Sequence, residues 1–455
     1  MKKLVIFTIV GLTYIQGLAQ FGPQQIIDTQ GLIPRYVQTA DIDGDGDQDV
    51  VSAISGSDST AWHENLDGQA NFGPLQPISI NVQDVRFVTT ADLDGDGALD
   101  VVTTCPGDDI VLWNRNMDGL GDFGFNNIIA TNAIAAIVCA AGDLDGDGDT
   151  DVVSANLNDN TVAWYENLNG SGSFGPEQVL DTGILSARFV LVSDIDGDND
   201  NDVLAVSTGL ARVFLFRNTD GNGNFTPPIE LPGVAGGTVS MDAKDLDGDG
   251  DIDILVAAST LNSLYWIENT DGLGTFGPEI TIDTRGSLVQ GVYAEDLDAD
   301  GDVDIVSITS DGEVAWYENT DGLGTFSTAQ VISLDADNGR GIYAADLDGD
   351  GDNDVLSASI TGNKIAWYEN LTILGVTESQ LKATILYPNP TKNIFKIETT
   401  ATIKSIQLYN SAGQEISAVI QKNNQVDCTN LSAGIYTVVI EDTIGNKFSE
   451  KIVKE

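Results

Sequence analysis

A nine-residue acidic segment recurs seven times along the chain, and this regularity restricts the fold to a repeat architecture. The segment has the form Asp-x-Asp-Gly-Asp-Gly-x-x-Asp or a close variant. Successive copies start 51 residues apart, except for a last step of 50 residues. The copies begin at Asp41, Asp92, Asp143, Asp194, Asp245, Asp296 and Asp346. All six Trp follow the same period, and Leu215 takes the place of a seventh.

Each repeat unit predicts four short strands. In the third unit, β-branched and alternating apolar residues predict strands at 137–141, 151–155, 161–166 and 174–180, separated by Gly, Asn and Asp turns. Residues 21–371 show no helical periodicity. Seven units of four strands predict an all-β fold, a seven-bladed β-propeller, in which radial closure protects the sheet edges.

The two ends of the repeat region indicate how the ring closes. A strand at 21–28 precedes the first acidic segment, and the last unit stops at Asn370 without such a strand. We therefore expect residues 21–28 to complete the seventh blade, so that the first and last units are fastened together. The alternative is a ring of seven blades without this exchange.

The acidic segments have the ligand pattern of calcium loops. Asp occupies positions 1, 3, 5 and 9 of every copy, and position 6 is Gly, or Asn199 in the fourth, as a left-handed turn requires. Oxygen ligands without His or Cys favour calcium. Position 7 would contribute its backbone carbonyl, so its side chain is free to vary, as Ala98 does.

We expect up to seven Ca²⁺. The predicted ligand positions are Asp41, Asp43, Asp45, Asp47 and Asp49; Asp92, Asp94, Asp96, Ala98 and Asp100; Asp143, Asp145, Asp147, Asp149 and Asp151; Asp194, Asp196, Asp198, Asp200 and Asp202; Asp245, Asp247, Asp249, Asp251 and Asp253; Asp296, Asp298, Asp300, Asp302 and Asp304; Asp346, Asp348, Asp350, Asp352 and Asp354. An EF-hand does not match, because position 12 of the first copy is Ser52. Solvated turns are the other alternative, but the four carboxylates of each copy would then repel one another.

Charge is distributed unevenly and narrows the choice of partners. Residues 21–371 hold 62 acidic and 10 basic side chains, whereas 372–455 hold eight of each. Such acidity argues against nucleic-acid partners and anionic membranes. Four of the ten basic residues stand six positions before an acidic segment, namely Arg35, Arg86, Arg188 and Arg340. We predict that they line the mouth of the central channel, opposite the calcium face, and bind an anionic group such as a uronate or sulfate. Alternatively, each Arg pairs with a neighbouring carboxylate.

The remaining segments predict export and a second domain. Residues 1–19 have the basic start, apolar run and small-residue site of a secretory signal peptide, and no other stretch is long and apolar enough to span a membrane. A linker at 372–383 leads to a small β-sandwich of six or seven strands at 384–455. Cys105, Cys139 and Cys428 are expected to be buried free thiols, with a Cys105–Cys139 disulfide as the alternative.

Both parts resemble known families. The acidic loop, together with Phe-Gly-Pro at 72–74, 174–176 and 276–278, resembles the FG-GAP and VCBS repeats of integrin α-subunit propellers, which implies a propeller at 20–371 with calcium on one face. The tail has Leu-Tyr-Pro-Asn-Pro and a final Lys-Ile-Val-Lys. It resembles the type IX secretion C-terminal sorting domain of Bacteroidota. That resemblance implies handling by the type IX machinery, followed by release or attachment to the outer cell surface.

Three functions remain open at this point. The first is a secreted or surface non-enzymatic module, monomeric, for adhesion or carbohydrate binding, with a glycan or protein ligand. The second is a polysaccharide-degrading lyase or hydrolase, and the third is a structural scaffold. His63 is the single His and is expected on a blade surface, and neither a nucleophile elbow nor a phosphate loop occurs.

Overall fold

The fold is described from a computed structural model, in which the chain divides into two compact units between Thr372 and Ile373. It describes residues 20–372 except 234–235 and 285–287, and residues 385–454 except 400–402, 411–415, 417–418, 422–424, 430, 433 and 443–446. The predicted signal peptide at 1–19 lies outside the described residues. So does the predicted linker at 372–383, except for its first residue.

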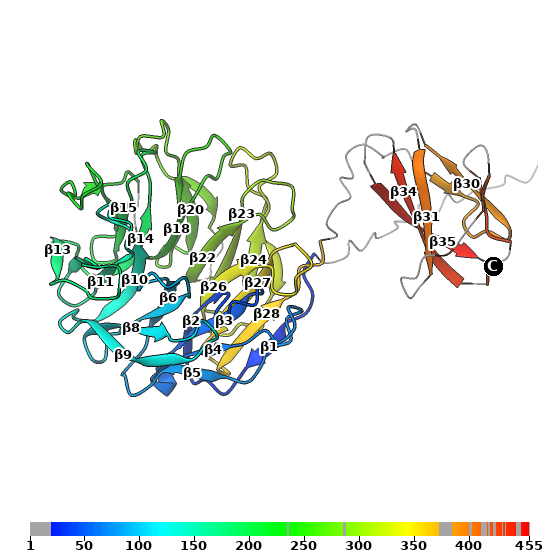
Figure 1. The fold of residues 1–455 in the computed structure, drawn as a ribbon. Helices are drawn as coiled ribbons and strands as arrows, with labels where there is room; N and C mark the ends of the chain where they lie inside the picture. The colour runs from blue at the N-terminus through cyan, green and yellow to red at the C-terminus, as the bar shows by residue number, and fades with distance from the viewer. Residues whose placement is uncertain are drawn as a thin grey trace, which may run out of the picture. The chain divides into compact units, whose positions relative to one another are not determined.

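The described part of the first unit forms seven four-stranded antiparallel sheets (Figure 1). Their first strands, which line the centre of the ring, are β2 (Pro34–Ala40), β6 (Phe87–Ala91), β10 (Ala136–Gly142), β14 (Ala187–Ser193), β18 (Thr238–Lys244), β22 (Val289–Glu295) and β26 (Gly339–Ala345). Each of these strands contacts the equivalent strand of both neighbouring sheets, and β26 contacts β2, so the ring is closed. The seven-bladed propeller is therefore confirmed.

The other three strands of each blade follow outward in chain order, except that β1 is the outermost strand of the seventh blade. The second strands are β3 (Asp49–Ile54), β7 (Asp100–Cys105), β11 (Asp151–Asn156), β15 (Asp202–Ser207), β19 (Asp253–Ala258), β23 (Asp304–Thr309) and β27 (Asp354–Ser359). The third strands are β4 (Ser59–His63), β8 (Ile110–Asn116), β12 (Thr161–Tyr165), β16 (Arg212–Phe216), β20 (Ser263–Ile267), β24 (Val314–Tyr317) and β28 (Lys364–Tyr368). The outermost strands are β5 (Gln76–Ser79), β9 (Phe123–Ala130), β13 (Gln178–Asp181), β17 (Ile229–Glu230), β21 (Ile280–Asp283), β25 (Gln330–Ser333) and β1 (Gln25–Asp28). The 3-10 turn of the described residues, η1 (Ser55–Ser57), follows β3.

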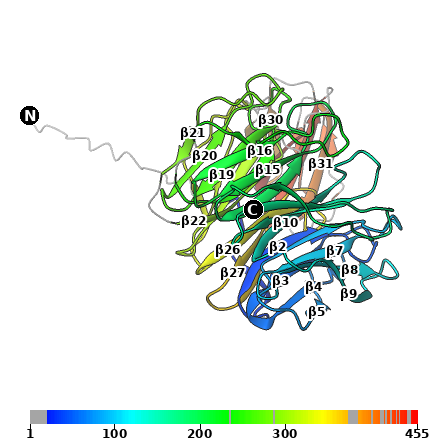
Figure 2. The same ribbon diagram turned by 90° about the vertical axis from the view of Figure 1, so that its left-hand side faces the viewer.

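The seventh blade is completed by the first strand of the chain, as predicted. Strand β1 pairs antiparallel with β28, with Gln25 opposite Trp367, and the Gly22 backbone N–H donates to the Glu369 carbonyl at 2.7 Å. The blue first strands and the yellow last blade accordingly lie side by side in both views (Figures 1 and 2). This exchange ties the two ends of the ring together and covers the open edge of β28.

The periodic Trp residues pack across the interface between blades. Trp113 is 5 % exposed and lies over Gly172 of the next blade, where an added Cβ would come within 2.1 Å of the indole. Gly172 also has a φ of +69°, so both its conformation and its lack of a side chain are required there. In the fourth unit Leu215 is too short for this contact, and Arg217 reaches the equivalent Gly274 instead.

Two expectations about the blades were wrong in detail. The outermost strand of the third blade is Gln178–Asp181, not 174–180, because Pro176 has no N–H for a ladder and Phe174 makes only an isolated bridge. His63 is 1 % exposed and therefore belongs to the interior of its blade. Burial lowers the pKa of its imidazole. The three cysteines are buried and free, as expected.

The second unit is a small β-sandwich. Its described residues form one sheet in the order β29 (Ile385–Tyr387), β30 (Ile394–Glu398), β33 (Gln425–Asp427), β32 (Val419–Gln421). The other sheet has the order β31 (Ile403–Asn410), β34 (Gly434–Asp442), β35 (Lys447–Lys454). Phe395 of the first sheet and Val438 of the second are fully buried in one core.

Candidate functional site

Each acidic loop joins the first strand of a blade to the second and gathers three carboxylates. Ligand oxygens of positions 1, 3 and 5 lie within 4.8 Å of one another in each of the first five loops, and the described residues hold two further acidic groups of this kind. Five of these groups are Asp41, Asp43 and Asp45; Asp92, Asp94 and Asp96; Asp143, Asp145 and Asp147; Asp194, Asp196 and Asp198; Asp245, Asp247 and Asp249. The alternating acidic positions therefore converge, as the sequence predicted.

Backbone N–H groups hold the position 1 carboxylate in place. In the first loop, Gly44 N donates to Asp41 Oδ1 at 2.8 Å and Gly46 N donates to Asp41 Oδ2 at 3.2 Å. Gly46 has a φ of +98°, which the turn requires. The loop is thus shaped around its first carboxylate by two glycines that recur in the other copies, with Asn199 and Ala299 as the exceptions.

Position 9 has a structural role that the sequence did not reveal. Asp151 is fully buried, and its carboxylate accepts the Leu144 N–H at 3.1 Å and the Asn167 N–H at 2.7 Å. The Asn167 side chain in turn donates to the Leu93 carbonyl of the preceding blade at 2.8 Å. Position 9 therefore fastens its loop to the third strand and to the neighbouring blade. That the position 9 carboxylate and the position 7 carbonyl also bind calcium stays a prediction.

Burial makes ionised carboxylates costly in these loops. Burial raises the pKa of the position 9 carboxyl to about 7 in the first five loops and to about 8 in the last two. At position 3 the pKa is also raised, by burial first and in six loops next by the position 5 carboxylate. The exception is Asp94, where Arg115 is the second influence and lowers the pKa. A bound cation would offset this repulsion.

The opposite ends of the first strands converge on a central cavity of about 410 Å³. Its lining includes the residue six positions before every loop, namely Arg35, Arg86, Ile137, Arg188, Val239, Gln290 and Arg340. In six blades this residue is the extra residue of a β-bulge, as between Pro34 and Tyr36. A bulge can redirect a side chain, and here it accompanies Arg35, Arg188 and Arg340 at the cavity wall, whereas the Arg86 blade has a regular ladder.

The four arginines differ in their partners. Arg86 donates twice to the Asp84 carboxylate, at 2.8 and 2.7 Å. Arg35 donates to Ser55 Oγ at 3.2 Å, and Arg340 donates to the side-chain oxygens of Asn338 and Gln290. Arg188 has no side-chain hydrogen bond or ion pair with any residue that the structure describes. Carboxylate pairing thus accounts for one Arg of the four in the described chain.

The arginines are close enough to repel one another. Burial, followed by repulsion from Arg86 and Arg340, lowers the pKa of Arg35 to about 10. Burial and then the same two neighbours lower the pKa of Arg188. Such a concentration of partly desolvated positive charge attracts anions.

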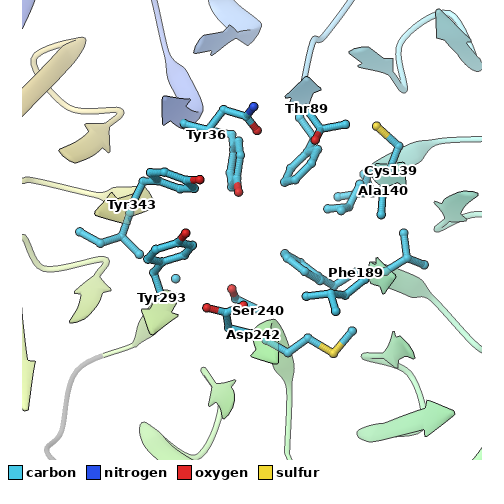
Figure 3. Close-up of a pocket in the computed structure, with 18 of the residues that line it drawn as sticks. Tyr36, Thr89, Cys139, Ala140, Phe189, Ser240, Asp242, Tyr293 and Tyr343 are labelled. Carbon is cyan, nitrogen blue, oxygen red and sulfur yellow. The ribbon is translucent and has the colours of Figure 1, made fainter. Parts of the chain in front are cut away.

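Deeper in the cavity lies a tier of aromatic rings and one acid that sequence reasoning missed. Figure 3 shows the rings of Tyr36, Phe189, Tyr293 and Tyr343 pointing into the cavity, with Asp242 at its edge. The Tyr293 and Tyr343 ring centroids are 4.3 Å apart. The Asp242 carboxylate accepts the Ala243 and Ala294 N–H groups, each at 2.9 Å. The sequence did contain a signal that these side chains share one level of the channel, because Asp242, Tyr293 and Tyr343 all stand three residues before a loop.

Structural comparison supports the fold. The crystal structure of BBS1N in complex with ARL6DN, soaked with lead, matches with a TM-score of 0.53 at 12 % identity over 77 % of this chain and 97 % of that one. The Chaetomium thermophilum Raptor structure matches with a TM-score of 0.52 at 10 % identity over 77 % of this chain and 29 % of that one. At such identities the similarity concerns the fold alone. A search of curated proteins gave no match.

Family models match both units of the chain. The FG-GAP-like repeat matches six overlapping segments, at 41–103, 92–154, 143–205, 194–256, 245–307 and 296–357. The secretion system C-terminal sorting domain matches residues 385–455, so the protein is exported by the type IX route to the cell surface or beyond. No helix in the described residues has the length and hydropathy needed to cross a membrane. The chain therefore belongs to the FG-GAP-like repeat family and ends in a secretion-system sorting domain.

Proposed function

We propose that this exported propeller is a calcium-stabilised, non-enzymatic binding module that takes an acidic glycan at the arginine-lined mouth of its central channel. The observation that carries the proposal is the convergence of Arg35, Arg86, Arg188 and Arg340 on one cavity of a strongly acidic domain. The loops and the cavity serve different purposes in this proposal, the first stability and the second recognition.

The donor set of the loops suits calcium. Its side-chain donors are carboxylate oxygens, and hard oxygen ligands select Ca²⁺ over softer metals. Asp94 Oδ1, Asp196 Oδ1 and Asp296 Oδ1, in the second, fourth and sixth loops, are buried and have no hydrogen-bond partner among the described residues, as expected of oxygens that face a cation. Positions 1, 3 and 5 would hold the ion, with the position 7 carbonyl and the position 9 carboxylate as further donors. Bound calcium would supply charge neutralisation, and no chemical step.

The charge of the cavity selects an anion. The propeller has 62 acidic and 10 basic side chains, so its surface repels anions almost everywhere. Four of those ten basic residues share this one cavity. Guanidinium groups bind carboxylates and sulfates through paired N–H donors. Since Arg188 has no such partner among the described residues, it is available to a ligand.

The aromatic tier favours a sugar over a peptide. Sugars have apolar C–H faces that pack on aromatic rings and hydroxyl groups that need hydrogen-bond acceptors. Beside the arginines, the cavity offers the rings of Tyr36, Phe189 and Tyr293 and the carboxylate of Asp242. A volume of about 410 Å³ lies within the range of small-ligand pockets. We therefore assign uronate- or sulfate-bearing glycans as the ligand class.

The test is retention on an array of neutral and acidic glycans, with the Arg86→Gln/Arg188→Gln double variant beside the unmodified protein. We expect binding to acidic glycans that falls at least tenfold in the double variant. Arg212→Gln is the matched control, because Arg212 pairs with Glu230 at 2.5 Å on the outer part of its blade.

Three outcomes would contradict the proposal. Equal retention of the double variant would remove the arginine site. Retention of acidic peptides but not of glycans would indicate a protein ligand. Cleavage products after incubation with acidic polysaccharides would indicate a lyase or hydrolase.

A further inference from the structure

One position beside the acidic loops divides the seven blades into two classes. It directly precedes the buried Asn that binds the position 9 carboxylate. Five blades have Glu there, namely Glu64, Glu166, Glu268, Glu318 and Glu369. The second and fourth blades have Arg115 and Arg217. The substitution reverses the charge next to two of the seven loops.

Arg115 occupies the second loop as a cation would. Its Nε lies 2.5 Å from Asp94 Oδ2, and its Nη2 lies 2.8 Å from Asp96 Oδ2. These two residues are positions 3 and 5 of the loop, and the Asp94 side chain is only 5 % exposed. A single guanidinium therefore bridges two of the three carboxylates that converge in this loop.

Arg217 approaches the fourth loop in the same way but less closely. Its Nη1 lies 3.5 Å from Asp196 Oδ2, again at position 3. The same side chain also donates to the Leu273 carbonyl, in the space that a Trp fills in most other blades. Arg217 thus combines packing with partial neutralisation of the loop.

The two Arg loops also depart from the repeat at other positions. Position 7 is Ala98 in the second loop and Asp in the other six. Position 6 is Asn199 in the fourth loop and Gly in the other six. The sixth loop, a Glu loop, departs as well, with Ala299 in place of the position 4 glycine, so the Arg residues themselves are what sets the second and fourth loops apart.

In the described contacts, no Lys or Arg pairs with the Glu residues of the other five blades. Glu166 accepts from Gln178 at 3.0 Å, and Glu64 accepts from Gln76 at 3.3 Å. Both donors are neutral amides, so they leave the negative charge of the Glu and of its loop in place. Each Glu loop is thus two charges more negative than the same loop would be with Arg.

We infer that this protein binds five calcium ions, one in each Glu loop, and that Arg115 and Arg217 take the place of the ion in the second and fourth loops. This inference rests on the calcium part of the proposed function. The guanidinium in two loops is independent evidence that these carboxylate groups take a cation. A divalent ion would have to displace an ion pair in the Arg loops, whereas in the Glu loops it meets only negative charge.

The test counts calcium bound to the intact protein after equilibrium dialysis against a saturating calcium buffer. We expect five ions for the unmodified protein, six for Arg115→Glu, and seven for Arg115→Glu/Arg217→Glu. The control Arg212→Glu changes the same charge away from the loops and should keep five ions. Near-ultraviolet circular dichroism of each variant checks that the fold is retained.

Several results would overturn this inference. Six or seven ions on the unmodified protein would show that Arg does not exclude calcium, while leaving the calcium proposal intact. A folded Arg115→Glu variant that binds no more calcium than the unmodified protein would also contradict the inference and leave the calcium proposal intact. This single variant remains informative even if replacing Arg217 disturbs the packing against Gly274. If no form of the protein binds calcium, the calcium part of the proposed function fails together with the inference.

Discussion

The two ends of the seven innermost strands differ in charge and in regularity. Each strand ends in an acidic loop, and all seven loops keep Asp at positions 1, 3, 5 and 9. At the strand starts, by contrast, Arg35, Arg86, Arg188 and Arg340 alternate irregularly with Ile137, Val239 and Gln290. About six residues, or ~20 Å, separate the two ends. A feature repeated in every blade serves the fold, whereas one that varies between blades is free to serve recognition.

Removing calcium should have the largest effect on stability, because every Glu loop then loses its bound ion at the same time. At a free calcium concentration of about ten times the dissociation constant, each site adds ~1.4 kcal/mol to the free energy of unfolding. We therefore expect excess EDTA to lower the melting temperature of the propeller by on the order of 10 °C. Differential scanning calorimetry with and without calcium measures this. The Arg86→Gln/Arg188→Gln variant should respond equally, and an unchanged melting temperature would contradict calcium binding.

Replacing a buried position 9 carboxylate should be costly even without metal. Asp151→Ala leaves the buried N–H groups of Leu144 and Asn167 unpaired, which we expect to lower the free energy of unfolding by about 2–4 kcal/mol. Asp147→Ala, at the exposed position 5, should cost less than about 1 kcal/mol under the same conditions. Urea unfolding in EDTA compares the two. Equal losses would mean that position 9 acts only as a ligand.

The acid within the channel should make stability depend on pH. Burial raises the pKa of Asp242 from 3.8 to about 6; Lys244 lowers that pKa and Glu295 raises it. Because the folded-state pKa exceeds the unfolded one, this carboxyl contributes stability below about pH 4 that is lost as pH rises through about 6.

Asp242→Asn should remove that loss. Between pH 4 and 7, the free energy of unfolding of the variant should rise relative to the unmodified protein by about 2 kcal/mol. Urea unfolding at each pH, with saturating calcium, measures the difference. A difference that is constant with pH would show that Asp242 titrates normally.

Replacing Arg188, which has no partner among the described residues, should stabilise the fold slightly. Burial and the nearby Arg340 and Arg86 disfavour the charge of Arg188, and the adjacent blades have Ile137 and Val239 at its position. We expect Arg188→Ile to raise the free energy of unfolding by about 1 kcal/mol while weakening acidic-glycan binding, a trade-off typical of functional residues. Arg86→Ile, which breaks two bonds to Asp84, should give a smaller gain. Destabilisation by Arg188→Ile would assign that Arg a structural role instead.

Much of the fold followed from spacing along the chain. The 51-residue period predicted seven blades, and the unpaired strand at 21–28 predicted the closure that β1 and β28 make. Both depend on local strand and turn signals that repeat, so errors in one unit are corrected by the others. The outermost strand and His63 were misplaced because their positions depend on which ladder bonds and interfaces form, and not on periodicity.

The sequence by itself determined the number of blades and the acidic positions that converge in each loop, because a tight turn brings alternating residues together without help from distant segments. Only the tertiary structure decided which side chains meet across the channel and between loop and strand. Bulges at the strand starts accompany three of the four arginines that line one cavity, and Arg115 reaches Asp94 from another strand. Such contacts depend on strand register and on ring closure, which bring together residues far apart along the chain.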